Sequence, residues 1–192
     1  GHNITGTVFI ECGAEYRADG PAALRPVGET EYVVAQAKQA RKGEAPGKPP
    51  ILGIVSHADL TLGAAVVDVL EAHQESAEGL LRGIRHSTAF YPDPPAVDRY
   101  AGRVAELMLQ PSFREGFAQL SSAGLSYDAW LLHTQITELT DLARAFPDTM
   151  IILDHFGGPL GIGPYSGKQA ELFPQWKADI AELARCENVV AK

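Results

Sequence analysis

The stretch Met150-Ile-Ile-Leu-Asp-His-Phe-Gly-Gly-Pro159 decides the fold class of this chain. Its four large apolar residues, 150–153, follow the breaker pair Phe146-Pro147 and are too few for an ordinary helix. We therefore expect a strand that is buried on both faces. An acid, an imidazole and a Gly-Gly-Pro turn stand at its carboxyl end, where parallel α/β folds place ligands and catalytic groups.

The composition indicates one soluble domain and excludes two classes of partner. The chain has 192 residues, of which 45% are hydrophobic and 21% are charged, enough to bury a sizeable core. The formal net charge of -8 argues against nucleic acid and anionic membranes as partners. No apolar run could cross a bilayer and no signal peptide is visible, so we expect a cytoplasmic protein. Cys12 and Cys186 lie far apart without a pairing motif, which suits a reducing compartment.

Strand-like and helix-like segments alternate along the chain. Apolar runs predict strands at residues 7–12, 51–55, 80–86, 126–133, 150–153 and 188–191. Between them, apolar positions at helical spacing predict helices at residues 29–41, 61–77, 97–109, 111–122, 136–146 and 171–185. This order is typical of a parallel sheet, either an open doubly wound sheet or a (β/α)8 barrel. No glycine-rich nucleotide-binding motif follows the first strand, which gives the open sheet little support. A complete barrel has eight strands, so the chain looks two strands short.

Polar residues gather where successive strands end. They are Glu11, His57 with Asp59, Arg85 with His86, His133 with Gln135, and Asp154 with His155. Since each group lies on a different strand, convergence at one mouth of the sheet is the simplest explanation. Such side chains could hold a divalent metal that activates water, or act as general acid and base on a polarised carbonyl.

Several of these residues also have structural interpretations. His57-Ala-Asp59 either caps the helix that starts near Thr61 or contributes to the site. Arg85 either pairs with a carboxylate between strands or binds substrate. His73 lies on a predicted helix, for which we expect a structural role. Side chains alternate along a strand, so an inward Leu153 would turn His155 inward and Asp154 toward the helices. We therefore expect His155 to be the reactive member, with Asp154 orienting a neighbouring imidazole.

Several motifs together resemble a known family. They are Leu81-Arg-Gly-Ile-Arg-His86, Pro111-Ser-Phe-Arg-Glu-Gly-Phe117, Gly124-Leu-Ser-Tyr-Asp128, His133-Thr-Gln135, Ala143-Arg-Ala-Phe-Pro147 and Leu153-Asp-His-Phe-Gly-Gly-Pro159. The sequence resembles the amidohydrolase-related family, and within it the sugar-lactonase-like branch. The resemblance covers residues 7–192.

The resemblance implies an α/β fold, a (β/α)8 TIM barrel with hydrolysis at the carboxyl ends of its strands. Residues 1–192 would form a single domain containing about strands two to seven of that barrel. The family's His-x-His pair on the first strand and aspartate on the eighth have no counterpart here. We therefore expect the domain to be incomplete at both ends and to belong to a longer protein.

The site residues predicted from the strand ends and the resemblance fall into three groups. The catalytic residues are His155 and Asp154. The substrate-binding residues are Glu11, Arg85, His86, Gln135 and Tyr165. One divalent metal ion, with zinc expected, is assigned to His133 and His155.

The function predicted on this basis is hydrolysis of a lactone or related cyclic ester of a sugar-like acid. Water would attack the carbonyl while His155 relays a proton, and Arg85 and Gln135 would hold substrate oxygens. Two alternatives remain: a metal-dependent decarboxylase of the same superfamily, and an inactive barrel fragment or scaffold. The partner is a small-molecule substrate, and the apolar strand faces suggest association, for example as a homo-oligomer.

Overall fold

Six parallel strands form one sheet in the described part of the chain, which is residues 3–41, 48–91 and 103–192 of a computed structural model. The strands lie in chain order, β1 to β6, and each pairs in parallel with the next. Their bounds are β1 Thr7–Ile10, β2 Ile51–Ser56, β3 Leu81–Arg85, β4 Ser126–Ala129, β5 Ile151–Leu153 and β6 Val189–Ala191. Because all six run the same way, their carboxyl ends lie along a single edge of the sheet.

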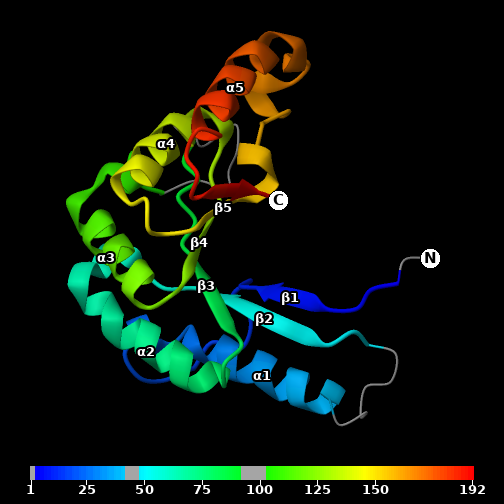
Figure 1. The fold of residues 1–192 in the computed structure, drawn as a ribbon, viewed down its shortest axis with the longest axis vertical. Coiled ribbons are helices and arrows are strands. Elements are labelled where there is room, and N and C mark those ends of the chain that lie inside the picture. Colours follow the sequence, from blue (N-terminus) through cyan, green and yellow to red (C-terminus); the bar gives the residue numbers. More distant parts are fainter. Residues whose placement is uncertain (1–2, 42–47, 92–102) are drawn as a thin grey trace.

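In the described part of the chain, five α-helices cover one face of the sheet (Figure 1). The helices are α1 Val27–Arg41, α2 Val66–Ala77, α3 Pro111–Ser122, α4 Ile136–Ala145 and α5 Gln169–Leu183. The sheet curves away from the helices and forms a half-barrel. The α/β class and the partial TIM barrel predicted from the sequence are thereby confirmed. Which strands of a complete barrel these six represent stays a prediction.

Most predicted elements are present with shifted ends. The predicted helix at 111–122 coincides with α3, whereas the strand predicted at 126–133 ends at Ala129. The helix predicted at 61–77 begins as a 3-10 turn, Leu60–Ala65, because Gly63 adopts a φ of 61° that interrupts the α-helix. Much of the helix predicted at 97–109 lies outside the described residues, and its final part is a 3-10 turn, Leu107–Leu109.

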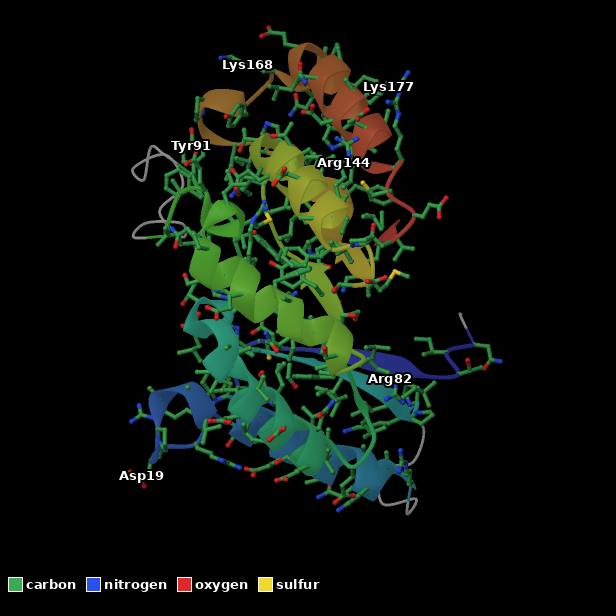
Figure 2. All side chains as sticks on the ribbon, turned by 60° about the vertical axis from the view of Figure 1, so that its left-hand side comes forward. Asp19, Arg82, Tyr91, Arg144, Lys168 and Lys177 are labelled. Atoms are coloured by element: carbon green, nitrogen blue, oxygen red, sulfur yellow. The ribbon has the colours of Figure 1, made fainter. Side chains whose placement is uncertain are left out.

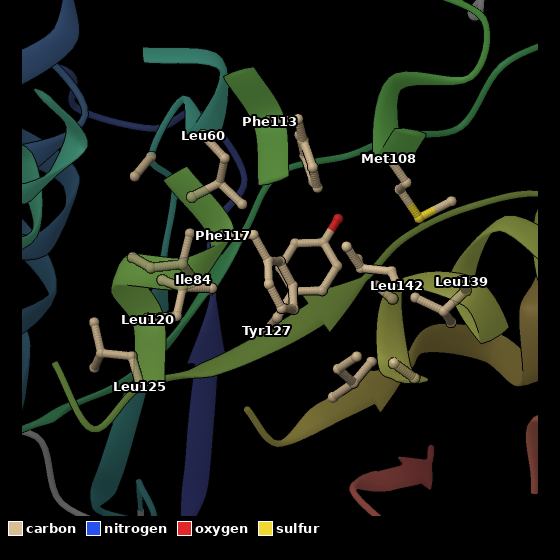
Figure 3. Packing of buried hydrophobic residues seen from close by; sticks show 14 of the residues in the cluster. Leu60, Ile84, Met108, Phe113, Phe117, Leu120, Leu125, Tyr127, Leu139 and Leu142 are labelled. Atoms are coloured by element: carbon tan, nitrogen blue, oxygen red, sulfur yellow. The ribbon is translucent and has the colours of Figure 1, made fainter. Parts of the chain in front are cut away.

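The main core lies between the sheet and helices α2, α3 and α4. Tyr127 on β4 is fully buried there, with its ring edge-on to Phe117 and Phe113 at centroid distances of 5.1 and 6.2 Å (Figure 3). Leu153 on β5 and Ile84 on β3 belong to the same cluster. A buried aromatic ring of this size stabilises the fold both by its large apolar area and by edge-to-face contacts.

Strand alternation then fixes the opposite, concave face of the sheet. Since Tyr127, Ile84 and Leu153 face the helices, their neighbours Asp128, Arg85 and Asp154 face the interior of the half-barrel. These charged groups come together at the carboxyl edge of the sheet. The curvature of the sheet therefore brings these charged side chains together at one mouth of the half-barrel.

The outer surface of the helix layer is strongly polar. Arg144 on α4 and Lys177 on α5 both extend from it into solvent (Figure 2). None of the helices in residues 3–41, 48–91 and 103–192 is long and apolar enough to cross a membrane.

The contact between α3 and the Leu60–Ala65 turn gives a test of the packing. A Cβ atom at Gly116 would lie 2.1 Å from the carbonyl oxygen of Leu60. Alanine normally stabilises a helix over glycine, yet here Gly116→Ala is expected to lower the free energy of unfolding by about 1–3 kcal/mol. Ser121→Ala, at an exposed position of the same helix, is expected to change it by less than about 0.5 kcal/mol. Urea denaturation measures both, and equal values would show that this turn yields to the methyl group.

Candidate active site

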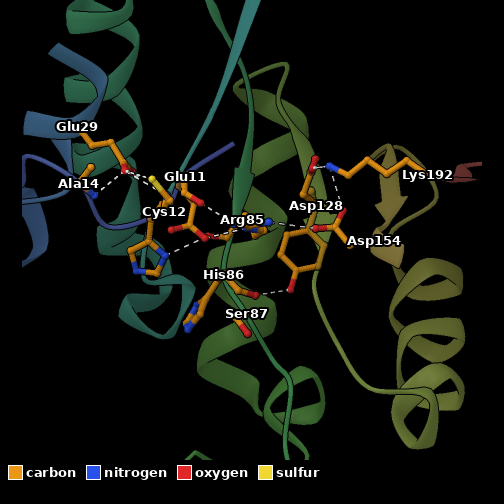
Figure 4. Close-up of polar contacts among 12 residues, drawn as sticks. Glu11, Cys12, Ala14, Glu29, Arg85, His86, Ser87, Asp128, Asp154 and Lys192 are labelled. Atoms are coloured by element: carbon orange, nitrogen blue, oxygen red, sulfur yellow. Dashed lines mark hydrogen bonds and ion pairs between the residues drawn. The ribbon is translucent and has the colours of Figure 1, made fainter. Parts of the chain in front are cut away.

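Arg85 joins three strands at the carboxyl edge of the sheet. Its guanidinium lies between Glu11, just beyond β1, and Asp154, just beyond β5 (Figure 4). Nε donates a hydrogen bond to Glu11 Oε1 at 2.7 Å, and Nη1 donates one to Asp154 Oδ2 at 3.3 Å. Burial alone would lower the pKa of Arg85, but the hydrogen bonds to Glu11 and Asp154 outweigh it and raise the pKa. Of the two roles left open for Arg85, the strand-linking ion pair is therefore present.

Lys192 extends this arrangement to a second buried aspartate. Its Nζ lies 3.0 Å from Asp154 Oδ1 and also contacts Asp128 Oδ2 (Figure 4). Asp128 and Asp154 are 0% and 1% exposed. Among the described residues, Asp128 Oδ1 has no hydrogen-bond partner, and Asp154 Oδ1 has only the ion-pair contact with Lys192. Burial raises the pKa of Asp128, an effect that Lys192 opposes. We call Glu11, Arg85, Asp154, Lys192 and Asp128 the ion-pair chain.

The directions of Asp154 and His155 are the reverse of the sequence-based expectation. Leu153 packs against the helices, so alternation turns Asp154, not His155, into the half-barrel. His155 is exposed, and its ring lies edge-on to Trp130 with centroids 6.3 Å apart. Residues 155–158 have φ values of 51°, 51°, 78° and 52°, so the strand has ended and alternation no longer applies. The expectation failed because it assumed an inward Leu153.

A polar pocket of about 390 Å³ opens beside the ion-pair chain, at the carboxyl ends of β1, β2 and β3. Its polar lining residues are Glu11, Tyr16, His57, His86, Ser87 and Arg103. We call it the histidine pocket. Its volume falls in the range of about 300–1,000 Å³ that small-molecule sites occupy. Burial raises the pKa of Tyr16 to about 12, so its phenol remains a hydrogen-bond donor at neutral pH.

Hydrogen bonds fix opposite tautomers for the two histidines of this pocket. His57 Nδ1 lies 3.0 Å from the carbonyl oxygen of Arg85, which can only accept, so Nδ1 carries the proton. Leu60 N donates to His86 Nδ1 at 3.1 Å, so in neutral His86 the proton is on Nε2. Burial and the neighbouring His57 lower the pKa of His86 to about 4, which keeps it neutral. The rings lie edge-on with centroids 5.5 Å apart, and among the described residues no hydrogen bond engages the acceptor Nε2 of His57 or the donor Nε2–H of His86.

Both interpretations of the segment after β2 have support in the geometry. Asp59 Oδ1 accepts a hydrogen bond from Thr61 N at 2.9 Å and so caps the Leu60–Ala65 turn. His57, two residues earlier, lines the histidine pocket. A short segment thus carries a cap and a site residue side by side.

His133 lies in a different pocket, and the ring of Tyr165 packs against it. His133 lines a largely apolar cavity of about 460 Å³ with Leu160, Phe173 and Trp176, between the loop after β5 and helix α5. Its ring lies edge-on to Tyr165 at 5.0 Å, and Nδ1 accepts a hydrogen bond from Leu160 N at 3.3 Å. Burial lowers the pKa of His133. Metal binding by His133 and substrate binding by Tyr165 stay predictions. Both residues lie away from the histidine pocket.

Gln135 is buried and bonded to backbone atoms. Its Oε1 accepts hydrogen bonds from Phe90 N at 2.9 Å and Leu132 N at 3.3 Å, while Nε2 donates to Thr88 O at 2.9 Å. The side chain is 3% exposed. It connects the segments that follow β3 and β4, and substrate binding by Gln135 stays a prediction.

Two members of the ion-pair chain were not identified from the sequence. The predicted strand at 126–133 includes Asp128 without a role, and the predicted strand at 188–191 stops one residue short of Lys192. The available signal was a carboxylate in the middle of an otherwise apolar run, because a buried charge requires a partner. Its partner is 64 positions away, so spacing could not have identified Lys192.

A sequence profile described as Amidohydrolase matches residues 10–192. The chain belongs to this amidohydrolase family. A protein of Sinorhizobium fredii (strain NBRC 101917 / NGR234) named "Uncharacterized protein y4mH" is 35% identical over 190 residues, which cover 99% of this chain and 54% of the relative. The chain therefore spans about half the length of the curated relative that it matches.

Solved amidohydrolase structures share the fold of this family member. An amidohydrolase of Burkholderia multivorans with bound HEPES is 20% identical with a TM-score of 0.59, covering 98% of this chain and 68% of that one. A second structure of a Burkholderia multivorans amidohydrolase, with bound zinc, is 18% identical with a TM-score of 0.59, over 98% and 69% of the two chains. Amidohydrolase 2 from Bifidobacterium longum subsp. infantis is 17% identical with a TM-score of 0.52, over 98% and 54%.

Amidohydrolases typically depend on a metal, and the sequence predicts a zinc site at His133 and His155. Among residues 3–41, 48–91 and 103–192, no three His, Cys, Asp or Glu side chains are placed to hold one ion together. His133 bonds to Leu160 N, whereas His155 packs on Trp130. The described residues therefore give the expected zinc ion no complete ligand set.

Removal of Arg85 tests the ion-pair chain. Arg85→Leu leaves Glu11 without a cation and Asp154 with Lys192 alone among the described residues, and a buried pair broken in this way costs about 3–5 kcal/mol of unfolding free energy. The matched control is Arg185→Leu, because Arg185 is 75% exposed and pairs only with Glu182 in the described residues. That surface pair is expected to contribute less than about 1 kcal/mol. Urea denaturation of both variants measures the difference, and similar losses would contradict a structural role for Arg85.

The buried histidines predict a loss of stability in mild acid. The folded-state pKa values of His73 and His86 are lowered to about 4, mainly by burial, from an unfolded value of about 6.5. The unfolded chain then binds more protons between these values, so stability is complete above about pH 6.5 and falls toward about pH 4. Each histidine contributes on the order of 2 kcal/mol to this loss.

The contribution of His86 can be separated by substitution. His86→Asn keeps an acceptor for Leu60 N but cannot titrate, so its unfolding free energy should fall less between about pH 6.5 and about pH 4 than that of the parent protein. Urea denaturation over this pH range measures both slopes. Identical slopes would exclude His86 as a source of the acid sensitivity.

Proposed function

We propose that the complete protein hydrolyses a lactone or related cyclic ester of a sugar-like acid. The observation that carries this proposal is the pair of opposite tautomers at His57 and His86 in one polar pocket. Ester hydrolysis requires a base for water and a donor for the carbonyl oxygen, and the pair offers both at a ring separation of 5.5 Å.

In the proposed reaction, His57 Nε2 accepts a proton as the water oxygen bonds to the acyl carbon of the substrate. The Nε2–H of His86 donates a hydrogen bond to the carbonyl oxygen, which carries the negative charge of the tetrahedral intermediate. The bond from the acyl carbon to the ring oxygen then breaks, and the leaving oxygen takes the proton from His57. The product is an open-chain hydroxy acid, and both histidines return to their starting states.

The other pocket residues suit a substrate rich in hydroxyl groups. Glu11 accepts hydrogen bonds, and Tyr16 and Ser87 carry hydroxyls at the rim. Arg85 acts on the site through two groups, because its side chain holds Glu11 and its carbonyl oxygen orients the His57 ring. Of the substrate-binding residues predicted from the sequence, Glu11 and His86 line this pocket, and Arg85 contacts Glu11 beside it.

Proton transfer is assigned here to His57 in preference to His155. His57 lines the pocket. His155, in contrast, is exposed beside Trp130 and has a left-handed backbone conformation two residues after β5 ends. Asp154 has its carboxylate engaged by Arg85 and Lys192, which suits electrostatic support of the mouth better than proton abstraction. The two assignments predict different effects of substitution.

His57→Asn tests the assignment in the complete protein. Asparagine retains a donor near the position of Nδ1 for the Arg85 carbonyl but has no base at the position of Nε2. We expect kcat/KM for the most reactive member of a panel of sugar-acid lactones to fall by roughly 10²–10⁴-fold. Proton release followed with a pH indicator measures the rate.

The control is His155→Asn, for which the expected change is less than about threefold. A large loss in His155→Asn with little loss in His57→Asn would transfer the proton relay to His155. No lactone turnover, together with release of carbon dioxide from aromatic carboxylic acids, would replace the hydrolase proposal with the decarboxylase alternative.

A further inference from the structure

A fully buried histidine lies directly behind His57. His73 on α2 is 0% exposed, and its Nε2 lies 2.9 Å from the carbonyl oxygen of His57. Its Nδ1 lies 2.8 Å from Thr30 Oγ1 on α1, which is 2.7 Å from Ser56 Oγ at the end of β2. This buried row of side chains therefore starts at β2, crosses two helices and returns to the residue that follows β2.

The chemistry of the partners fixes every proton in the row. The carbonyl oxygen of His57 can only accept, so His73 donates through Nε2–H. Burial lowers the pKa of His73 to about 4, so at neutral pH its Nδ1 has no proton and accepts from Thr30. The single hydroxyl proton of Thr30 is thereby used, and Ser56 must donate to Thr30 Oγ1. All the hydrogen bonds run in one direction and end at His57.

His57 is consequently held at two points. Its peptide carbonyl is bound by His73, and its ring Nδ1–H is bound by the carbonyl oxygen of Arg85. His57 comes one residue after the end of β2, so its orientation depends on these contacts rather than on its being inside the strand. Because the His57 peptide and Nδ1 are both fixed, the His57 ring can point its Nε2 in only one direction.

We propose that His73 is a positioning residue of the hydrolase, which fixes the peptide of His57 so that Nε2 of His57 faces the histidine pocket. This inference rests on the proposed function, in which His57 is the base. Thr30 has a lesser part, because its hydroxyl orients the His73 ring without touching His57, and the Ser56 hydroxyl bonds to Thr30 alone in this row. A small rotation of a catalytic base lowers the rate of the chemical step more than it lowers substrate binding.

Two amide substitutions separate this role from simple stabilisation. In His73→Gln the side-chain amide reaches the position of Nε2 and can still donate to His57 O, whereas in His73→Asn it reaches only the position of Nδ1. Both variants place an uncharged amide in the same buried space. In the complete protein we expect His73→Asn to lower kcat for lactone hydrolysis about tenfold with little change in KM, and His73→Gln to stay within about threefold of the parent protein.

A second readout does not depend on turnover. In protein with isotope-labelled histidine, the NMR signal of the His57 Nδ1–H proton should be slow to exchange with water in the parent protein and in His73→Gln. It should exchange faster in His73→Asn, where the peptide is released. Thr30→Val, which removes only the hydroxyl that orients His73, is expected to lower kcat about threefold and replaces His73→Asn if that variant does not fold.

Equal losses of kcat in the Gln and Asn variants, or an unchanged His57 signal in His73→Asn, would overturn the positioning role. If Thr30→Val is used in place of His73→Asn, an unchanged kcat would overturn the positioning role. Ser56→Ala serves as the matched control, because it removes a buried hydroxyl from the same row but leaves the bond between His73 and His57 in place. If the parent protein hydrolyses no lactone, the proposed function fails, while the NMR comparison still decides whether His73 positions His57.

Discussion

The buried guanidinium of Arg85 is the constraint on which the mouth of this half-barrel depends. Arg85 is largely removed from water, and so is Asp154, which is 1% exposed. An unpaired buried ion costs several kcal/mol, and here Glu11 and Asp154 neutralise Arg85 while Arg85 and Lys192 neutralise Asp154. Because Glu11, Arg85 and Asp154 follow or end different strands, their pairing requires the sheet to curve as it does. The curvature of the sheet and the arrangement of the site therefore both depend on the pairing of these buried charges.

The same condition bears on the orientation of the pocket histidines. The carbonyl oxygen of Arg85 accepts from His57, so a member of the ion-pair chain also orients the proposed base. On the other side, the backbone of the Leu60–Ala65 turn fixes His86 through Leu60 N. Backbone groups of rigid elements therefore determine which nitrogen of each imidazole faces the pocket, as preorganised catalysis requires.

The strand and helix order was predictable from the sequence because apolar runs and helical spacing are local properties. For the mouth, the sequence predicted that polar residues gather there, but not the direction or partner of each side chain. Asp154 and His155 show the limit, since their directions depend on which face Leu153 buries, and that is decided by helices distant in the sequence. Lys192 shows it again, because its partner Asp128 lies 64 positions earlier and no local pattern connects them. Proton positions on His57 and His86 required the backbone partners.

The left-handed turn at residues 155–158 restricts the evolutionary drift of this segment. Residues with a Cβ atom lose roughly 1–2 kcal/mol each in this conformation, and His155 and Phe156 both adopt it. At Gly158 a Cβ atom would lie 2.5 Å from the carbonyl oxygen of Leu131, so that position admits no side chain without movement of the backbone. A descendant that lost this glycine would have to rebuild the segment that precedes His133, so selection on the turn also constrains residues outside it.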